Sequence, residues 1–148
     1  MNVMVDTNVV LDDILDRLPN TENAREISRL VTDEYVNGYL TANSITDIFY
    51  IVSKYRDEDI ARKTVKNLLL SFGVVGVDGK DCQVAIDMSM RDFEDALAVV
   101  CAEKESLDYI ITNDNNFLNE TDFSISTINP ADFLLQHRGK FLLEKMGE

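Results

Sequence analysis

Short apolar runs that are typical of buried strands alternate along the chain with longer segments of helical periodicity. The runs fall at residues 2–5, 39–41, 74–77, 108–112 and 124–128. Apolar residues recur every three or four positions in the other segments, which predicts helices there. These predicted helices cover residues 9–18, 21–35, 43–52, 57–70, 81–90, 92–107 and 131–145. The alternation favours an α/β fold in one domain over residues 1–148, with a mostly parallel sheet and helices on both faces.

Local signals refine the predicted ends of these elements. Thr21 is a candidate helix cap, and Gly38 is expected to end the helix that begins there. The segment Asn113–Asn116 is expected to form a turn, and Pro130 suits the first position of the closing helix. The closing segment carries more apolar residues than an outer helix needs. Two alternatives follow, internal packing or a surface for a second copy or a partner.

Composition narrows the possible chemistry more than it narrows the fold. The chain has 14 basic and 27 acidic side chains, a net charge of −13, and its single histidine is His137. The sequence therefore does not supply the residues for a histidine-based zinc site or a Ser-His-Asp triad. Cys82 and Cys101 have no metal-type spacing and are expected to be reduced and packed. No secretory signal or membrane-length apolar run is visible, so a cytoplasmic protein without a membrane partner is expected.

Four aspartates fall where a parallel sheet would gather them. Asp6 and Asp114 follow predicted strands, and Asp47 and Asp95 lie in the first turns of predicted helices. The carboxyl ends of parallel strands share one edge with the starts of the following helices. Two carboxylates about 4 Å apart repel by about 4 kcal/mol at an effective dielectric of 20. A divalent cation such as Mg²⁺ or Mn²⁺ would neutralise them and would suit phosphodiester hydrolysis.

Each of these acids also has a purely structural explanation. Asp47 follows Ser44 in a helix-capping pattern, and Asp95 follows Asp92 in the same pattern. Asp6 and Asp114 could simply begin turns. The case for a cation site therefore depends on the four acids meeting in space.

Four segments of the chain resemble the signature motifs of PIN-domain ribonucleases, many of which are toxins of bacterial toxin–antitoxin pairs. They are Val5–Asp12, Arg91–Leu97, Tyr109–Asp114 with Phe117 after it, and Ile128–Leu134. The resemblance implies a three-layer α/β/α fold and a metal-dependent endoribonuclease. It also implies an RNA substrate, a homodimer and a cognate antitoxin.

Carried over by position, the resemblance assigns catalytic roles to Asp6, Asp47, Asp95 and Asp114. Asp6, Asp95 and Asp114 would hold Mg²⁺ or Mn²⁺, and Asn8 and Thr112 would support the site. The sequence departs from the family at three positions. Asp47 stands where glutamate is usual and would reach a metal only through water, Asn113 replaces a frequent basic residue, and Asn116 replaces a frequent aspartate.

The net charge opposes binding to a polyanion, but the basic residues are unevenly distributed. Residues 54–66 contain five basic and three acidic side chains, a local balance of +2. This segment could steer phosphates toward the acidic edge, or it could be a solvated helix face with internal ion pairs. The basic members are Lys54, Arg56, Arg62, Lys63 and Lys66.

Other classes fit less well. Phosphatases with an aspartate nucleophile need a second aspartate two residues later, where this chain has Asn8. A receiver domain would need a paired acid and a lysine that cannot be placed, and the glycines of residues 73–79 do not form a dinucleotide-binding turn. A catalytically inactive PIN-like module that binds RNA or protein remains the main alternative.

Overall fold

The computed structural model describes residues 1–147 and is built on a five-stranded sheet in the order β3-β2-β1-β4-β5. Every strand pair is parallel. The strands are β1 (Asn2–Val5), β2 (Asn37–Thr41), β3 (Gly73–Val75), β4 (Tyr109–Ile111) and β5 (Ser126–Ile128). All five predicted strands are present, and the sheet is parallel throughout.

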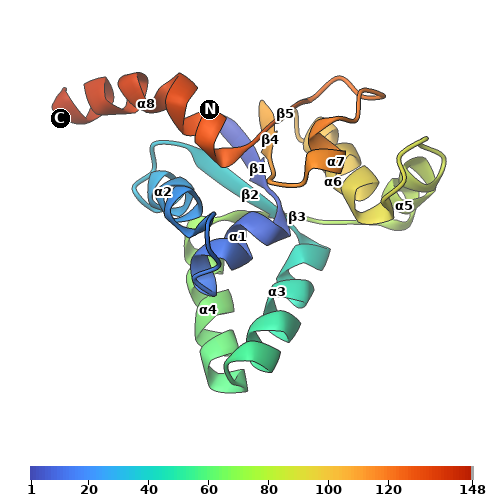
Figure 1. Cartoon of the computed structure of the whole chain (residues 1–148). Coiled ribbons are helices and arrows are strands. Elements are labelled where there is room, and N and C mark those ends of the chain that lie inside the picture. Colours follow the sequence, from blue (N-terminus) through green and yellow to red (C-terminus); the bar gives the residue numbers. More distant parts are fainter. Residues whose placement is uncertain (148) are drawn as a thin grey trace.

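Helices cover both faces of the sheet (Figure 1). They are α1 (Thr7–Ile14), α2 (Thr21–Thr32), α3 (Ala42–Tyr55), α4 (Glu58–Ser71), α5 (Gly79–Ile86), α6 (Phe93–Lys104), α7 (Asn115–Leu118) and α8 (Pro130–Met146). The helices α3 and α4 pack against each other as a hairpin that projects from the sheet. No helix within residues 1–147 has both the length and the apolar composition required to cross a bilayer.

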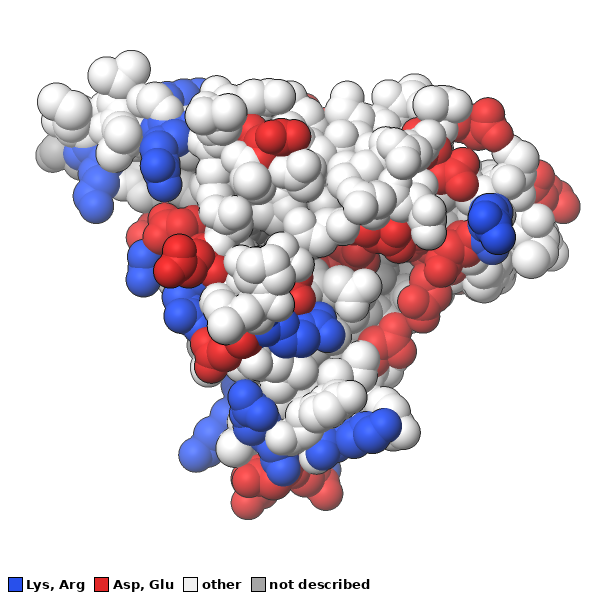
Figure 2. All heavy atoms as spheres, in the orientation of Figure 1, with Lys and Arg blue, Asp and Glu red and all other residues white. Residues whose placement is uncertain are grey.

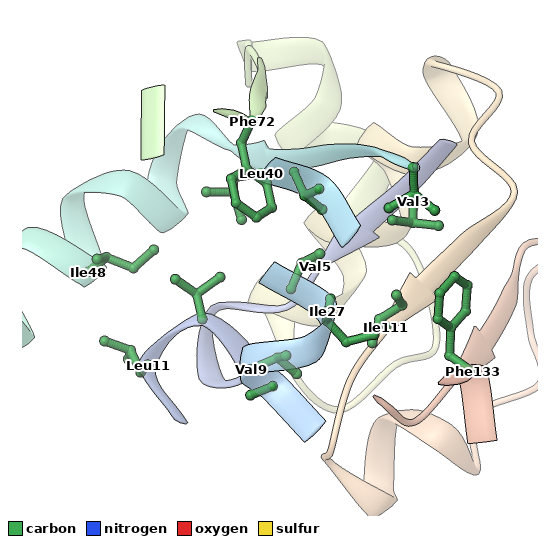
Figure 3. Close-up of a cluster of buried hydrophobic side chains, with 14 of the residues drawn as sticks. Val3, Val5, Val9, Leu11, Ile27, Leu40, Ile48, Phe72, Ile111 and Phe133 are labelled. Atoms are coloured by element: carbon green, nitrogen blue, oxygen red, sulfur yellow. The ribbon is translucent and has the colours of Figure 1, made fainter. Parts of the chain in front are cut away.

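Alternating residues of the central strands define the two layers of the core. In β1, Val3 and Val5 join the cluster that α1, α2 and α8 cover, whereas Met4 joins the cluster that α6 covers. Figure 3 shows side chains of the first cluster, with Val9 of α1 and Ile27 of α2 packed together beside the sheet. The expected three-layer α/β/α arrangement is confirmed.

Gly38 does not end a helix, as the sequence suggested, but lies inside β2. Helix α2 ends at Thr32, and Glu34 in the following turn has a φ of 63°. An added Cβ on Gly38 would lie 2.7 Å from a methyl carbon of Val31 and 2.8 Å from the ring of Phe72. The glycine is therefore required by close packing between β2, α2 and the residue after α4.

We expect Gly38→Ala to lower the free energy of unfolding by about 1–3 kcal/mol, because these side chains would have to move. Gly139→Ala is the matched control, since nothing lies within 4 Å of its added Cβ and alanine favours a helix. Urea denaturation of both variants measures the difference. Equal stability of the two variants would contradict the packing role of Gly38.

Smaller corrections concern local signals. Asn20, not Thr21, is the N-cap residue of α2, and Thr21 is the first residue of the helix. The predicted turn at Asn113–Asn116 runs into the short helix α7. Cys82 and Cys101 are both free thiols, and only Cys101 is fully buried. Pro130 begins α8 as predicted.

Helix α8 combines the two alternatives that the sequence left open. Phe133, Leu134 and Phe141 are buried in the first core cluster. Leu142 and Leu143 are exposed, as are Leu135 and Met146. The ring of His137 lies 4.7 Å from the ring of Phe133, so the only histidine belongs to the packing of this helix. Internal packing therefore uses one side of α8 and leaves the other side free.

Candidate active site

Asp6 and Asp114 lie at the carboxyl edge of the two central strands, as the sequence predicted. Asp6 follows β1, and its backbone N–H donates to the carbonyl oxygen of Ile111 in β4 at 2.9 Å. Asp6 precedes α1, but its side chain accepts no capping hydrogen bond. The Asp114 side chain does cap α7, accepting from the backbone N–H of Asn116 at 2.9 Å. Asp114 therefore has a local structural role as the cap of α7, whereas the Asp6 carboxylate does not cap α1.

Thr112 joins these two acids into one hydrogen-bonded unit. Its hydroxyl donates to Oδ2 of Asp6 at 2.8 Å and accepts from the backbone N–H of Asp114 at 3.0 Å. The Thr112 side chain is completely buried, so these bonds are its means of satisfying a polar group in the core. Thr112 therefore holds Asp6 and the backbone of Asp114 together, at the position where the resemblance implied a supporting residue. Asn8, the other implied supporting residue, has an exposed side chain.

Asp95 faces the same edge from the first turn of α6. Asp92 is the N-cap of this helix and accepts from the backbone N–H of Asp95 at 3.0 Å, so its capping role is confirmed. Burial, followed by repulsion from Asp92, Asp6, Asp114 and Glu94, raises the pKa of Asp95 to about 7. Because Asp6 and Asp114 contribute to this shift, the three acids lie within electrostatic reach of one another.

Burial also raises the pKa of Asp6, and the hydrogen bond from Thr112 partly opposes that increase. Repulsion from Asp114 and Asp92 adds to the upward shift. Two neighbouring carboxyl groups at this edge thus carry pKa values above their ordinary range. Shifts of this kind are concentrated at functional sites, although structural networks also produce them.

Asp47 lies beside the site but does not cap α3. The cap of α3 is Thr41, whose hydroxyl accepts from the backbone N–H of Ser44 at 3.3 Å. The capping explanation for Asp47 is therefore wrong. Asp47 instead lies close to Glu94, because burial, followed by repulsion from Asp47 and contact between the two carboxyl groups, raises the pKa of Glu94.

A further acid at this edge is Glu94, which no pattern in the sequence singles out. It lines a small groove together with Asp6 and Asp95, and Asp47 is not part of this lining. Glu94 lies inside the capping pattern of residues 92–95. In that pattern Asp92 and Asp95 already have roles, so the sequence gives no reason to assign one to Glu94. Only the tertiary structure, in which α3 and α6 both line this groove, shows that Glu94 lies at the cluster.

Within residues 1–147, no lysine or arginine forms an ion pair with Asp6, Glu94, Asp95 or Asp114. The neighbouring Asp12 differs, because Arg17 pairs with it at 3.0 Å and Asn113 donates to it at 3.2 Å. Arg91 lines a second groove with Asp95 and Asp114. Figure 2 shows acidic side chains gathered between α3 and α6 on this face. The site is therefore an uncompensated acidic cluster.

The donor set fits a hard divalent cation. All donors are carboxylate oxygens, with the hydroxyls of Thr7, Ser44 and Thr41 joined in a hydrogen-bonded row nearby at 2.7 and 2.9 Å. In the part of the chain that the structure describes, no three carboxylates are arranged as a complete ligand cage. The sheet edge thus carries negatively charged carboxylates that could bind a cation, but they do not form a closed coordination sphere.

Comparison with known proteins identifies the family. A sequence model of the PIN domain matches residues 2–116, which include Asp6, Asp47, Asp95 and Asp114. This chain belongs to the PIN-domain family. The match spans β1 to the beginning of α7, so the acidic edge lies within the part of the chain that matches the PIN domain.

Relatives of this PIN domain include ribonuclease VapC1 of Aquifex aeolicus, which is 27% identical over 120 residues, covering 78% of this chain and 83% of that protein. Among solved structures, VapBC2 of Rickettsia felis superimposes with a TM-score of 0.65 at 16% identity, covering 87% of this chain and 98% of that chain. VapC20 of Mycobacterium tuberculosis, a toxin that cleaves the sarcin–ricin loop, superimposes with a TM-score of 0.63 at 14% identity. The superposition covers 78% of this chain and 92% of that chain. These structures share the fold of this chain.

Proposed function

We propose that this PIN domain is an endoribonuclease that depends on Mg²⁺ or Mn²⁺, and that the whole chain forms one nuclease domain. The observation that carries the proposal is the Asp6–Thr112–Asp114 unit with Asp95 opposite it and no basic partner among the described residues. A ribonuclease relative and toxin–antitoxin neighbours support this choice of reaction. An RNA substrate also fits the expected cytoplasmic location.

Asp6, Asp95 and Asp114 would hold the cation in this proposal. A bound divalent cation supplies positive charge that screens the scissile phosphate and lowers the pKa of a water molecule. The protein's own part is to position the ligands. Thr112 fixes the Asp6 carboxylate, and the cap by Asp92 fixes the first turn of α6 around Asp95.

Glu94 and Asp47 would act behind these ligands. The raised pKa of Glu94 beside Asp47 would limit the negative charge on that side of the groove. Asp47 keeps the catalytic role that the resemblance assigns to it, but it would exert that role through Glu94 as well as through water. Arg91, which lines the groove of Asp95 and Asp114, would contact the phosphate of the RNA.

The direct test is incubation of single-stranded RNA with the protein and Mn²⁺ or Mg²⁺, followed by gel analysis. We expect internal cleavage that EDTA stops and that added Mn²⁺ restores, because carboxylates alone offer no positive charge to a phosphate. Cleavage that continues in EDTA would contradict the metal dependence. Binding of RNA without cleavage of any tested RNA would favour the inactive PIN-like module instead.

We also propose that the protein is a toxin with a cognate antitoxin and that it forms a homodimer. The antitoxin is suggested by the toxin–antitoxin complexes among the structural neighbours. Its test is co-expression with the product of the adjacent reading frame, which should suppress RNA cleavage. Persistent cleavage beside an abundant, folded neighbour product would count against that partner.

For the homodimer, the surface to test is the exposed side of α8, which carries Leu142 and Leu143. Apolar surface of this kind is often covered by a second subunit. Light scattering should give twice the chain mass for the wild type and the single-chain mass for Leu143→Glu. A monomeric wild type at micromolar concentration would refute the dimer.

A further inference from the structure

The exposed aromatic rings among the described residues belong to α3 and α6, the two helices whose first turns line the acidic groove. Among residues 1–147, only Tyr50, Tyr55 and Phe93 are exposed aromatics, with 66%, 62% and 41% of their surfaces accessible. Tyr50 and Tyr55 belong to α3, and Phe93 is the first residue of α6, directly before Glu94. Burial of such rings is normally favourable, so exposed rings on the two helices that line the acidic groove indicate a surface that receives a ligand.

One stripe of α3 connects the acidic edge to the tip of the α3–α4 hairpin. Asn43, Asp47, Tyr50 and Lys54 follow one another at spacings of four, three and four residues, which places them on one side of the helix. Asn43 lines the groove of Asp6 and Asp95. Lys54 lies about 10 Å further along the helix than Asp47, since each residue advances by about 1.5 Å. The stripe therefore leads directly away from the acidic cluster.

The tip itself carries available positive charge. Of the five basic residues in segment 54–66, which contains the tip, only Arg62 forms an ion pair within the described chain, with Glu58 at 2.8 Å. The acidic residues there are partly occupied, because Asp57 caps α4 by accepting from the backbone N–H of Ile60. The ammonium of Lys54 lies 5.8 Å from the ring centre of Tyr55. Figure 2 shows blue side chains near the end of the α3–α4 hairpin, with a red group among them at its lowest point.

We propose that the α3 stripe and the hairpin tip bind single-stranded RNA on its way to or from the acidic cluster. Bases would stack on Tyr50 and Tyr55, and Lys54 and its basic neighbours at the tip would contact phosphates. This inference rests on the proposed ribonuclease function and names the surface that positions its substrate. It also explains how a chain with a net charge of −13 holds a polyanion.

The combination of rings and cations favours a single strand over a duplex or a protein. Aromatic side chains can stack on unpaired bases, but paired bases inside a helix do not expose their faces. An apolar protein partner would require a continuous apolar face, whereas this stripe alternates acidic, aromatic and basic residues. A single strand uses both the rings and the charges.

Fluorescence anisotropy with a labelled single-stranded oligoribonucleotide in EDTA tests the binding surface separately from cleavage. We expect Tyr50→Ala to weaken binding about tenfold and Tyr50→Phe to keep it within about twofold, because phenylalanine retains the ring. Lys54→Ala should weaken binding and reduce the slope of log affinity against log salt by about 0.7. Lys145→Ala, at the far end of α8, is the charge-matched control and should change neither quantity.

Cleavage kinetics in Mn²⁺ distinguish failure of this surface from failure of the proposed function. With an active wild type, Tyr50→Ala should raise KM with kcat nearly unchanged, since the ring binds ground state and transition state alike. Unchanged binding and KM in Tyr50→Ala and Lys54→Ala, with an active wild type, would overturn the surface and leave the tip for a protein partner. An inactive wild type that loses RNA binding in both variants would retain the surface and refute the nuclease. Absence of both binding and cleavage would refute both.

Discussion

Asp95→Asn should abolish metal-dependent RNA cleavage while making the metal-free protein more stable. Loss of residues that only support metal ligands already costs tenfold to a hundredfold, so loss of a ligand should reduce cleavage by at least about a hundredfold. Stability should rise because the Asp95 carboxyl group is half-buried among other acids and has a pKa of about 7. Opposite effects on activity and stability are typical of a residue selected for chemistry.

The sign of the pH dependence follows from that pKa. The ordinary value is 3.8, so the folded protein holds the Asp95 proton more tightly than the unfolded chain does. Ionised Asp95 therefore lowers the free energy of unfolding by its full amount above pH 7. This loss of stability decreases as the pH falls from 7 toward 4, and it is absent below pH 4. At pH 8 we expect the free energy of unfolding of Asp95→Asn to be about 1–2 kcal/mol higher than that of the wild type, after allowing for the partial exposure of Asp95. Near pH 4 the two free energies should be equal.

Urea denaturation in EDTA at pH 8 and pH 4 measures this difference, with Asp87→Asn, an exposed aspartate at the end of α5, as control. Addition of Mg²⁺ at pH 8 should stabilise the wild type more than Asp95→Asn, since ligand binding to the folded state adds to its stability. A less stable Asp95→Asn at pH 8, or one that retains full cleavage, would contradict the assigned role.

Thr112→Val should reduce both stability and cleavage. Valine preserves the shape of the buried side chain but removes the hydroxyl that links Asp6 to the backbone N–H of Asp114. The N–H and the carboxylate would each lose a partner in a partly buried place, which costs about 1–3 kcal/mol. Cleavage should fall about tenfold to a hundredfold, because the Asp6 carboxylate would lose its fixed orientation.

Thr112→Ser is the matched control for this prediction, since it keeps the hydroxyl and loses only a methyl group. It should retain most of the cleavage activity and of the hydrogen-bonded unit. Thermal unfolding and initial rates of RNA cleavage measure the two effects. If Thr112→Val and Thr112→Ser behave alike, the hydroxyl is not what orients Asp6.

The basic segment 54–66 shows how a prediction from sequence depends on packing for its meaning. Its excess of positive charge is evident in the sequence, and so is the competing explanation of ion pairs along one helix. The structure shows one such pair, between Arg62 and Glu58, and it places the ammonium of Lys54 near the exposed ring of Tyr55. Exposure of a ring depends on what the rest of the chain covers, and no local pattern contains that information.

The sequence by itself determined the parallel α/β fold and the edge at which Asp6, Asp95 and Asp114 lie, because alternation of strands and helices fixes which ends of the elements meet. It did not determine the function of individual polar groups. Tertiary structure decided that Asp47 is no cap, that Glu94 joins the cluster, and that Gly38 is required by Val31 and Phe72. The last two outcomes depend on residues far apart in the chain, whose distances are set only when the helices take their places against the sheet.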